Sequence, residues 1–195
     1  ELEIKDIWKQ YEYFDNFLEE LPDYIDVIII PGNHDAVRRA EPSPALDKKL
    51  FMTNPYLCSN PSYVDIEGIT HLIYHGTSLD SIISNIKGLD YVNVVNAMIE
   101  QLKRRHLSPI YGTNPIAPEE FDYLVIDRLP NVYHAGHLHR TQVGKYFSTY
   151  LVNSGTFQDR TPYQLKQGHL PTPGKVPIFE IKTNNFTIWD LYEYS

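Results

Sequence analysis

Residues 27–35, V-I-I-I-P-G-N-H-D, carry the pattern from which we interpret the rest of the chain. Four consecutive β-branched apolar residues predict a short strand that is covered on both faces. The Pro-Gly pair that follows removes a backbone donor and permits a sharp turn, so the strand should end there. Asn33, His34 and Asp35 would then lie at its carboxyl end, where open sheets carry ligand sites. These residue types also favour an ordinary turn, so the stretch alone does not decide between a site and a turn.

Histidines stand at the ends of two further strand-like runs. H-L-I-Y-H-G places His75 after one run, and N-V-Y-H-A-G-H-L-H places His137 and His139 after the other. In an extended segment residues two apart point the same way, so His137 and His139 should reach one metal cluster. Three strand ends that carry Asn or His predict a divalent-metal site at one edge of a sheet.

The remaining histidines are predicted to lie outside this site. His71 and His134 belong to strand-like runs and are expected to be structural, although a supporting contact to the site is an alternative for His134. His106 and His169 occur in polar, loop-like contexts and are expected to be exposed.

Neighbouring residues around the motifs supply a ligand, an acid and an anion. Asn33 offers a neutral carbonyl oxygen, and His34 offers an imidazole that titrates near neutral pH. Asp35 is an anion that could orient this imidazole from behind. Arg38 and Arg140 follow the two motifs closely and are candidates for phosphate contacts.

The composition fits one globular domain over residues 1–195. Of the 195 residues, 42% are hydrophobic and 22% charged, which is enough for a sizeable core. The formal net charge of −8 predicts weak DNA binding by this chain alone, because nucleic-acid binders usually present a basic surface. The one dense basic run, at 103–105, is interpreted as a solvated helix end.

The cysteine content and the hydropathy pattern indicate the cellular setting. Cys58 is the single cysteine, which excludes an internal disulfide and predicts a free thiol in a reducing cytoplasm. No apolar run approaches the ~20 residues that span a bilayer, so no membrane partner is expected.

Apolar periodicity predicts a mixture of helices and strands, that is, an α/β or α+β fold. Helices are expected at 2–21, 78–87 and 92–105, the last with an inward stripe of Val92, Val95, Met98, Ile99 and Leu102. Strands are expected at 63–66 and 69–74 as a hairpin, near 132, and within 143–152 and 178–188 with a turn at 184–185. Residues 40–61 and 108–118 should be mostly loop, with a short helix at 46–52 and a short element at 123–129.

The ordered motifs G-N-H-D, Y-H-G and G-H-L-H resemble the later motifs of the calcineurin-like metallophosphoesterase superfamily. Together with N-S-G-T-F-Q and P-G-K-V-P-I-F-E-I-K, they resemble the family of small subunits of archaeal family-D DNA polymerases, from about residue 27 to residue 182. The resemblance implies a metallophosphoesterase-type two-sheet sandwich flanked by helices. It also implies a metal-dependent 3′–5′ exonuclease that acts on DNA 3′ ends together with a large catalytic polymerase subunit.

The resemblance also implies a role for each motif residue. Asn33, His75 and His137 would ligate one metal ion, and His139 would ligate a second. His34 would be the catalytic residue that stabilises the phosphate charge or protonates the leaving oxygen. These ligand types suit two divalent cations, with Mn²⁺ expected first and Fe²⁺, Zn²⁺ or Mg²⁺ as alternatives.

The metallophosphoesterase superfamily that the motifs resemble carries two earlier motifs, Asp-x-His and Gly-Asp-x-x-Asp, which are found nowhere in this sequence. The chain begins at Glu1 almost inside a helix, so we expect an N-terminally truncated fragment with little activity of its own. Two alternatives stay open: a noncatalytic scaffold subunit of the polymerase, and another phosphoesterase of the superfamily.

Overall fold

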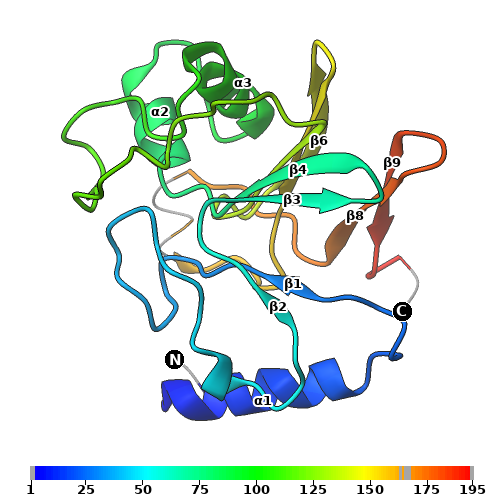
Figure 1. The fold of residues 1–195 in the computed structure, drawn as a ribbon. Helices are drawn as coiled ribbons and strands as arrows, with labels where there is room; N and C mark the ends of the chain where they lie inside the picture. Colours follow the sequence, from blue (N-terminus) through cyan, green and yellow to red (C-terminus); the bar gives the residue numbers. More distant parts are fainter. Residues whose placement is uncertain (1–2, 163, 165–167, 194–195) are drawn as a thin grey trace.

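The computed structural model describes residues 3–162, 164 and 168–193, and these form a mixed α/β fold (Figure 1). The N-terminal part contains helix α1 (Ile7–Glu19), strand β1 (Ile28–Ile29), 3₁₀ helix η1 (Lys48–Leu50) and strand β2 (Tyr56–Leu57). The middle contains β3 (Ser62–Ile66), β4 (Ile69–Tyr74), α2 (Leu79–Asn85), α3 (Val94–Arg104) and β5 (Val132–Ala135). The last four strands are β6 (Thr141–Tyr146), β7 (Thr149–Ser154), β8 (Lys175–Glu180) and β9 (Asn185–Asp190). The expected α/β class is confirmed.

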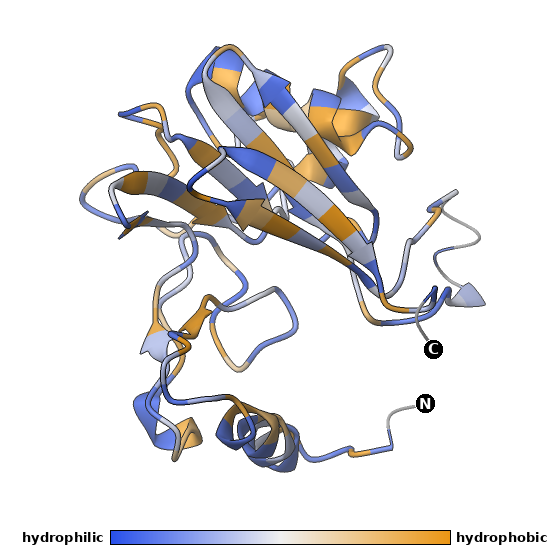
Figure 2. Ribbon diagram, turned by 90° about the vertical axis from the view of Figure 1, so that its right-hand side faces the viewer, coloured by the Kyte–Doolittle hydropathy of each residue, from blue (hydrophilic) through white to orange (hydrophobic). Residues whose placement is uncertain are grey.

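A five-stranded main sheet, in the order β3-β4-β5-β7-β6, forms the centre of the fold. Its inner pairs β4–β5 and β5–β7 are parallel, whereas the outer pairs β3–β4 and β6–β7 are antiparallel. Hydrophobic and hydrophilic residues alternate along its strands (Figure 2). Helices α2 and α3 cover one face and bury a large core with the sheet, in which Tyr74, Met98 and Leu151 are 0–1% exposed. The parallel inner strands direct their carboxyl ends to one edge, which is the arrangement that the predicted site needs.

A second, smaller layer lies below the main sheet in Figure 1 and consists of α1, β1, η1 and β2. We call it the α1 layer. Asp6 begins α1 because its carboxylate accepts hydrogen bonds from the backbone amides of Trp8 and Lys9. The buried core of this layer contains Tyr11, Leu46 and Phe51. The predicted helix 2–21 is thus shorter than expected, and its first residue lies outside the described part of the chain.

The prediction for strand 27–30 is wrong in one respect. In place of a strand covered on both faces, β1 has two residues, and residues 27–30 are all half-buried. Within the described residues β1 pairs only with β2, in parallel, so the apolar run is covered on fewer sides than its composition suggested. Burial depends on neighbouring elements that the run itself does not reveal.

The other element predictions have mixed outcomes. The hairpin of β3 and β4, the short helix at η1 and helices α2 and α3 are confirmed. Val95, Met98 and Leu102 are buried as expected, but Val92 is 40% exposed because it precedes α3. Residues 123–129 form no helix or strand and contribute only a bridge between His106 and Val125.

The hairpin of β8 and β9 packs against the main sheet through aromatic rings. Phe179 lies 5.7 Å from Tyr150 and 4.8 Å from Phe186 between ring centroids. None of the helices within the described ranges has the length and apolar character needed to cross a membrane.

Candidate metal centre

The carboxyl ends of β4 and β5 bring two of the predicted ligands together. Tyr74 and Ala135 are paired at the ends of these strands, and the amide of Gly136 donates to the carbonyl oxygen of His75 over 3.0 Å. Gly76 adopts a φ of +103°, and a Cβ at this position would lie 2.9 Å from the oxygen of Gly136. A side chain at position 76 would therefore push the two strand ends apart.

The segment after β5 is not extended, contrary to the prediction that His137 and His139 share one face of a strand. β5 ends at Ala135, and His137 has a φ of +64°, in the left-handed region that residues with a Cβ rarely adopt. A bent turn, rather than strand alternation, thus orients both imidazoles. Such strained backbone is common where a functional group is held in position.

A chain of polar contacts joins three of the predicted ligands. The amide oxygen Oδ1 of Asn33 lies 2.8 Å from Nε2 of His75, and this nitrogen lies 3.2 Å from Nδ1 of His137. Nε2 of His137 lies 2.8 Å from the carboxylate of Asp80. The structure thus brings together the G-N-H-D turn, the end of β4 and the turn after β5.

Asp80 belongs to the first turn of α2 and was not identified from the sequence. Burial raises the pKa of its carboxyl, but hydrogen bonds from His137 and Tyr91 and the charges of His137 and His169 together lower it, and the net pKa lies below its usual range. As a carboxylate, Asp80 accepts a hydrogen bond from Nε2–H of His137, and in the tautomer that carries its proton on this nitrogen Nδ1 has a free lone pair. An acidic residue at the start of a helix is common for other reasons, so no pattern marked Asp80.

The electrostatics favour a neutral His75. Burial, together with the nearby charges of His137, His34 and His139, lowers the pKa of His75 to about 3. Neutral His75 carries one ring proton at most, yet its Nε2 faces two acceptors, Asn33 Oδ1 and His137 Nδ1. One acceptor therefore has no proton available to it.

This donor set fits a divalent cation. Three lone-pair atoms that lie 2.8 and 3.2 Å apart have about the spacing of neighbouring ligands around one ion, roughly 3 Å for bonds of ~2.1 Å. In the part of the chain that the structure describes, no three His, Cys, Asp or Glu side chains form a group that could hold a metal. The cluster is compatible with this absence, because its third lone-pair atom is the amide oxygen of Asn33, which is none of these residue types. Asp80 contacts Nε2 of His137, the ring nitrogen that does not face His75.

His139 and His34 lie around this cluster. The ring of His139 contacts the side-chain amide of Gln164 through Nδ1, and burial followed by the charge of His137 lowers its pKa. His34 is exposed, and its charge acts on both His75 and His139. An exposed imidazole beside a half-buried ligand cluster is accessible to a substrate.

Asp35 does not have the predicted role of orienting an imidazole. One carboxylate oxygen accepts from the amide of Gly32 over 2.6 Å, and the other accepts from the Tyr11 hydroxyl over 2.7 Å. Burial raises the pKa of Tyr11 to about 12, so this hydroxyl remains a donor at neutral pH. Asp35 therefore closes the G-N-H-D turn and attaches it to α1.

A buried polar network supports His75 from the other side. The amide of His75 donates to Oδ1 of Asn60 over 2.7 Å, and Nδ2 of Asn60 donates to Glu41 over 3.3 Å. Glu41 is 2% exposed and also accepts from the Tyr74 hydroxyl over 2.8 Å. Burial raises the pKa of the Glu41 carboxyl. Because each of these groups is hydrogen-bonded, the network can fix the backbone at the end of β4.

The two candidate arginines hold loops beside the cluster. Arg38 donates to the carbonyl oxygen of Pro42 and forms an ion pair with Glu119. Arg140 donates to the carbonyl oxygens of Val92 and Leu170 over 2.8 and 3.2 Å. Contacts of either arginine to phosphate remain a prediction.

The other histidines differ in part from expectation. His169 is half-buried, with its ring 4.3 Å from that of Tyr91, and its charge acts on Asp80 and His139. His106 is also half-buried and lies 3.0 Å from Asp122, so the expectation of exposure is wrong for both. His134 lies within β5, where burial lowers its pKa to about 4.

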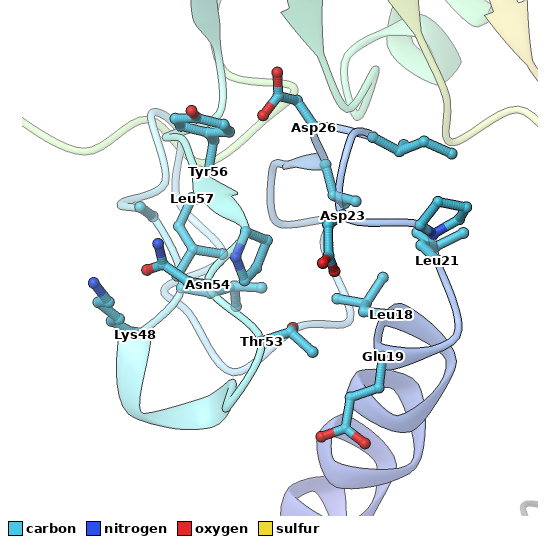
Figure 3. A pocket seen from close by; sticks show the side chains of 16 residues that line it. Leu18, Glu19, Leu21, Asp23, Asp26, Lys48, Thr53, Asn54, Tyr56 and Leu57 are labelled. Carbon is cyan, nitrogen blue, oxygen red and sulfur yellow. The ribbon is translucent and has the colours of Figure 1, made fainter.

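A hollow of about 930 Å³ is separate from the histidine cluster, because none of the histidines lines it. Figure 3 shows that it lies between the end of α1 and strand β2, with Leu18, Glu19, Tyr56 and Leu57 on its walls. It carries no group that resembles the histidine cluster, so we place the candidate site at the ends of β4 and β5.

Comparison with known proteins assigns the chain to a family. The family of B subunits of DNA polymerases alpha and epsilon matches residues 5–143, and the chain belongs to this family. The chain is also similar to proteins named DNA polymerase II small subunit. One from Archaeoglobus fulgidus is 49% identical over 183 residues, which cover 92% of this chain and 38% of the relative.

Two further relatives with the same name give a consistent result. The protein from Methanocaldococcus jannaschii is 43% identical, with 95% of this chain and 33% of the relative covered. The protein from Methanothermobacter thermautotrophicus is 41% identical, with 100% of this chain and 41% of the relative covered. The resemblance stated from the motifs is confirmed, and the chain spans about two-fifths or less of these relatives.

Among solved structures, Vps29 complexed with zinc from Entamoeba histolytica matches with a TM-score of 0.34 and 14% sequence identity. The match covers 66% of this chain and 51% of that one. A likeness this slight supports no argument about the site.

Proposed function

We propose that this chain carries the later-motif part of the metal-dependent 3′–5′ exonuclease centre of the small subunit of an archaeal two-subunit DNA polymerase. The observation that supports this most directly is the meeting of Asn33, His75 and His137 at 2.8 and 3.2 Å. These three side chains come from separate parts of the chain, and ordinary packing does not require such a set of lone pairs. The names of the archaeal relatives support the polymerase context.

Each residue has a defined task in this proposal. Asn33, His75 and His137 would hold one divalent cation, and His139 would contribute to a second. Such cations neutralise a phosphodiester and supply an activated water for its hydrolysis. His34, which is exposed beside the ligands, would donate a proton to the leaving 3′ oxygen or hydrogen-bond to the phosphate.

Asp80 would act as a positioning residue for His137. Its contact to Nε2 holds the proton on that nitrogen and directs Nδ1 toward His75. Carboxylates that hold metal-ligating histidines in this way raise the basicity of the ring and fix its orientation.

The large polymerase subunit is the proposed partner. A chain with a net charge of −8 has little to offer the DNA backbone, and Arg38 and Arg140 are already engaged with loops. Most of the positive surface that holds the primer would therefore come from other parts of the assembly.

The test uses the full-length small subunit with Mn²⁺ and a primer that has a mismatched 3′ end. His34→Ala should reduce excision by about 10²- to 10⁴-fold and leave the bound metal unchanged. His75→Ala should reduce both excision and the metal content measured by elemental analysis. His106→Ala is the matched control, because His106 is also half-buried and paired with a carboxylate, and it should change neither.

Two outcomes would contradict the proposal. Absence of excision by the unaltered small subunit, while it still binds the large subunit fully, would favour the noncatalytic scaffold. Loss of metal in His34→Ala, or full metal content in His75→Ala, would contradict the assigned roles.

A further inference from the structure

A second cavity, of about 330 Å³, opens beside His34. Its lining comes from α1, from β1, from the residues that flank η1 and from the G-N-H-D turn. These residues are Ile7, Gln10, Tyr11 and Phe14, then Ile29, Leu46 and Phe51, and His34 and Asp35. Its volume lies at the lower end of the range of ligand pockets, which suits a small aromatic group rather than a large ligand.

Three aromatic rings form the walls of this cavity. The ring of Phe51 lies 6.0 Å from that of Tyr11 and 6.4 Å from that of Phe14, with interplanar angles of 68° and 80°. These edge-to-face contacts hold the rings in fixed orientations. Tyr11 and Phe51 are 7% exposed, whereas Phe14 is 43% exposed and forms the open side.

Hydrogen bonds connect the cavity to the candidate catalytic turn. The Tyr11 hydroxyl donates to Asp35 over 2.7 Å and accepts from the amide of Ala36 over 3.0 Å. The position of the aromatic wall relative to His34 is therefore set by the same contacts that close the turn.

We propose that this aromatic cavity binds the base of the nucleotide that is being removed. The proposal rests on the proposed exonuclease function and adds a subsite to it. A base and its phosphate are joined through one sugar, so a phosphate at Asn33 and His75 requires its base in a neighbouring space. The cavity beside His34 is such a space, and its aromatic and aliphatic walls match the apolar face of any base.

The electrostatics of the chain favour stacking as the source of affinity. The net charge is −8, so the chain as a whole offers little attraction to the DNA backbone. Stacking of a base on an aromatic side chain does not depend on charge and tolerates every base. A proofreading site must accept any of the four bases, and a wall without directed hydrogen bonds meets this requirement.

The test compares two oligonucleotides that differ only at the 3′ terminus, where one has adenine and the other an abasic residue. The full-length small subunit is assayed with Mn²⁺, and the ratio of kcat/KM values gives the preference for a base. We expect a preference of roughly fivefold or more, the lower range for one stacked base.

Variants of one exposed residue make this test specific. Phe14→Ala should reduce the preference to about one while the rate on the abasic terminus stays unchanged, and Phe14→Tyr should keep the preference. Phe17→Ala is the matched control, because Phe17 is 50% exposed on the same helix and lies outside the lining of the cavity. It should leave both rates as they are.

The outcomes separate this proposal from the proposed function. Equal rates on the two termini, or a preference that survives Phe14→Ala, would overturn the base subsite and leave the exonuclease intact. If neither oligonucleotide is cleaved, the exonuclease proposal fails, and fluorescence anisotropy without metal still tests the cavity. Tighter binding of the adenine terminus that is lost in Phe14→Ala would support the subsite, and equal binding would overturn it.

Discussion

The main sheet and the α1 layer both contribute residues to the candidate site, but the buried core behind these residues is large in the main sheet and small in the α1 layer. The main sheet holds His75 and His137 at the ends of strands that pack on a large buried core with α2 and α3. The α1 layer holds Asn33 and His34 after a two-residue strand, above a buried core of Tyr11, Leu46 and Phe51. The proposed ligands therefore lie across a boundary between a part with a large buried core and a part with a small one.

This difference indicates which part controls the geometry of the site. The imidazoles of His75 and His137 are held by strand pairing and by buried polar groups, so they should keep their positions when the α1 layer moves. Asn33 depends on the Asp35 contacts that attach its turn to α1. We therefore expect the α1 layer to limit the affinity for the proposed metal ion.

The largest expected effect compares the same substitution in the two parts. Leu151→Ala, at a fully buried position in β7, should lower the free energy of unfolding by about 3–5 kcal/mol because it leaves a cavity in a tightly packed core. Leu46→Ala, at a 6% exposed position in the α1 layer, should lower the free energy of unfolding by about 2–3 kcal/mol, because the few side chains of this small core can move into the cavity. Urea unfolding measures both, and equal losses would contradict the comparison.

A second effect concerns only the main sheet and follows from His134. Burial, and then the charge of His71, lowers the pKa of His134 to about 4 in the folded chain, from an ordinary value near 6.5. As the pH falls, the unfolded chain therefore takes up this proton before the folded chain does. The folded state keeps its full stability above about pH 6.5 and loses stability as the pH falls toward about 4. The loss should approach about 3 kcal/mol, on the scale of 1.36 kcal/mol per pH unit.

The control for this effect is His134→Gln, which removes the titration. Urea unfolding at about pH 7 and about pH 4.5 should show a smaller decrease for this variant than for the unaltered chain. The same decrease in both proteins would show that His134 does not cause it.

A third prediction concerns the carboxylate that positions a ligand from the main sheet. Asp80→Ala should weaken metal binding by about 10- to 100-fold, as expected when the partner of a metal-ligating histidine is lost. Asp122→Ala is the matched control. The carboxylate of Asp122 lies 3.0 Å from Nε2 of His106, a histidine outside the cluster. Isothermal titration with Mn²⁺ measures both variants, and equal losses of affinity would argue against a positioning role for Asp80.

The smallest expected effect is in the α1 layer. Tyr11→Phe keeps the aromatic ring but removes the hydroxyl between Asp35 and the amide of Ala36. We expect a loss of about 1 kcal/mol in stability and faster hydrogen exchange at residues 32–36 than at the end of β4. Exchange that increases equally in both segments would remove the distinction between the two parts.

Local patterns were sufficient to predict several strands of the main sheet, but not their order, and to single out the histidines of the candidate site. The β3–β4 hairpin, α2 and α3 have clear periodicity, and the histidines after β4 and β5 follow directly from their strands. The rule that neighbouring parallel strands end at one edge accounts for His75 and His137, which follow β4 and β5. Asn33 follows β1, which pairs with β2 outside the main sheet, so this rule does not account for it.

Features that depend on the neighbours of a residue could not be predicted in this way. The cover on β1 is set by which strands pair with it, and the run at residues 27–30 is the same in either case. Asp80 resembles any acidic residue in a first helical turn, and His169 lies in a polar segment that gave no signal. Asp35 looked like a partner for an imidazole but contacts the backbone of its own turn.

The left-handed backbone of His137 has a consequence for the stability of the chain. Glycine adopts a φ of +64° without steric cost, whereas histidine adopts it only at the expense of stability. Exchange of His137 for glycine would remove this cost together with the imidazole. The turn after β5 thus trades some stability of the chain for a side chain that can face His75.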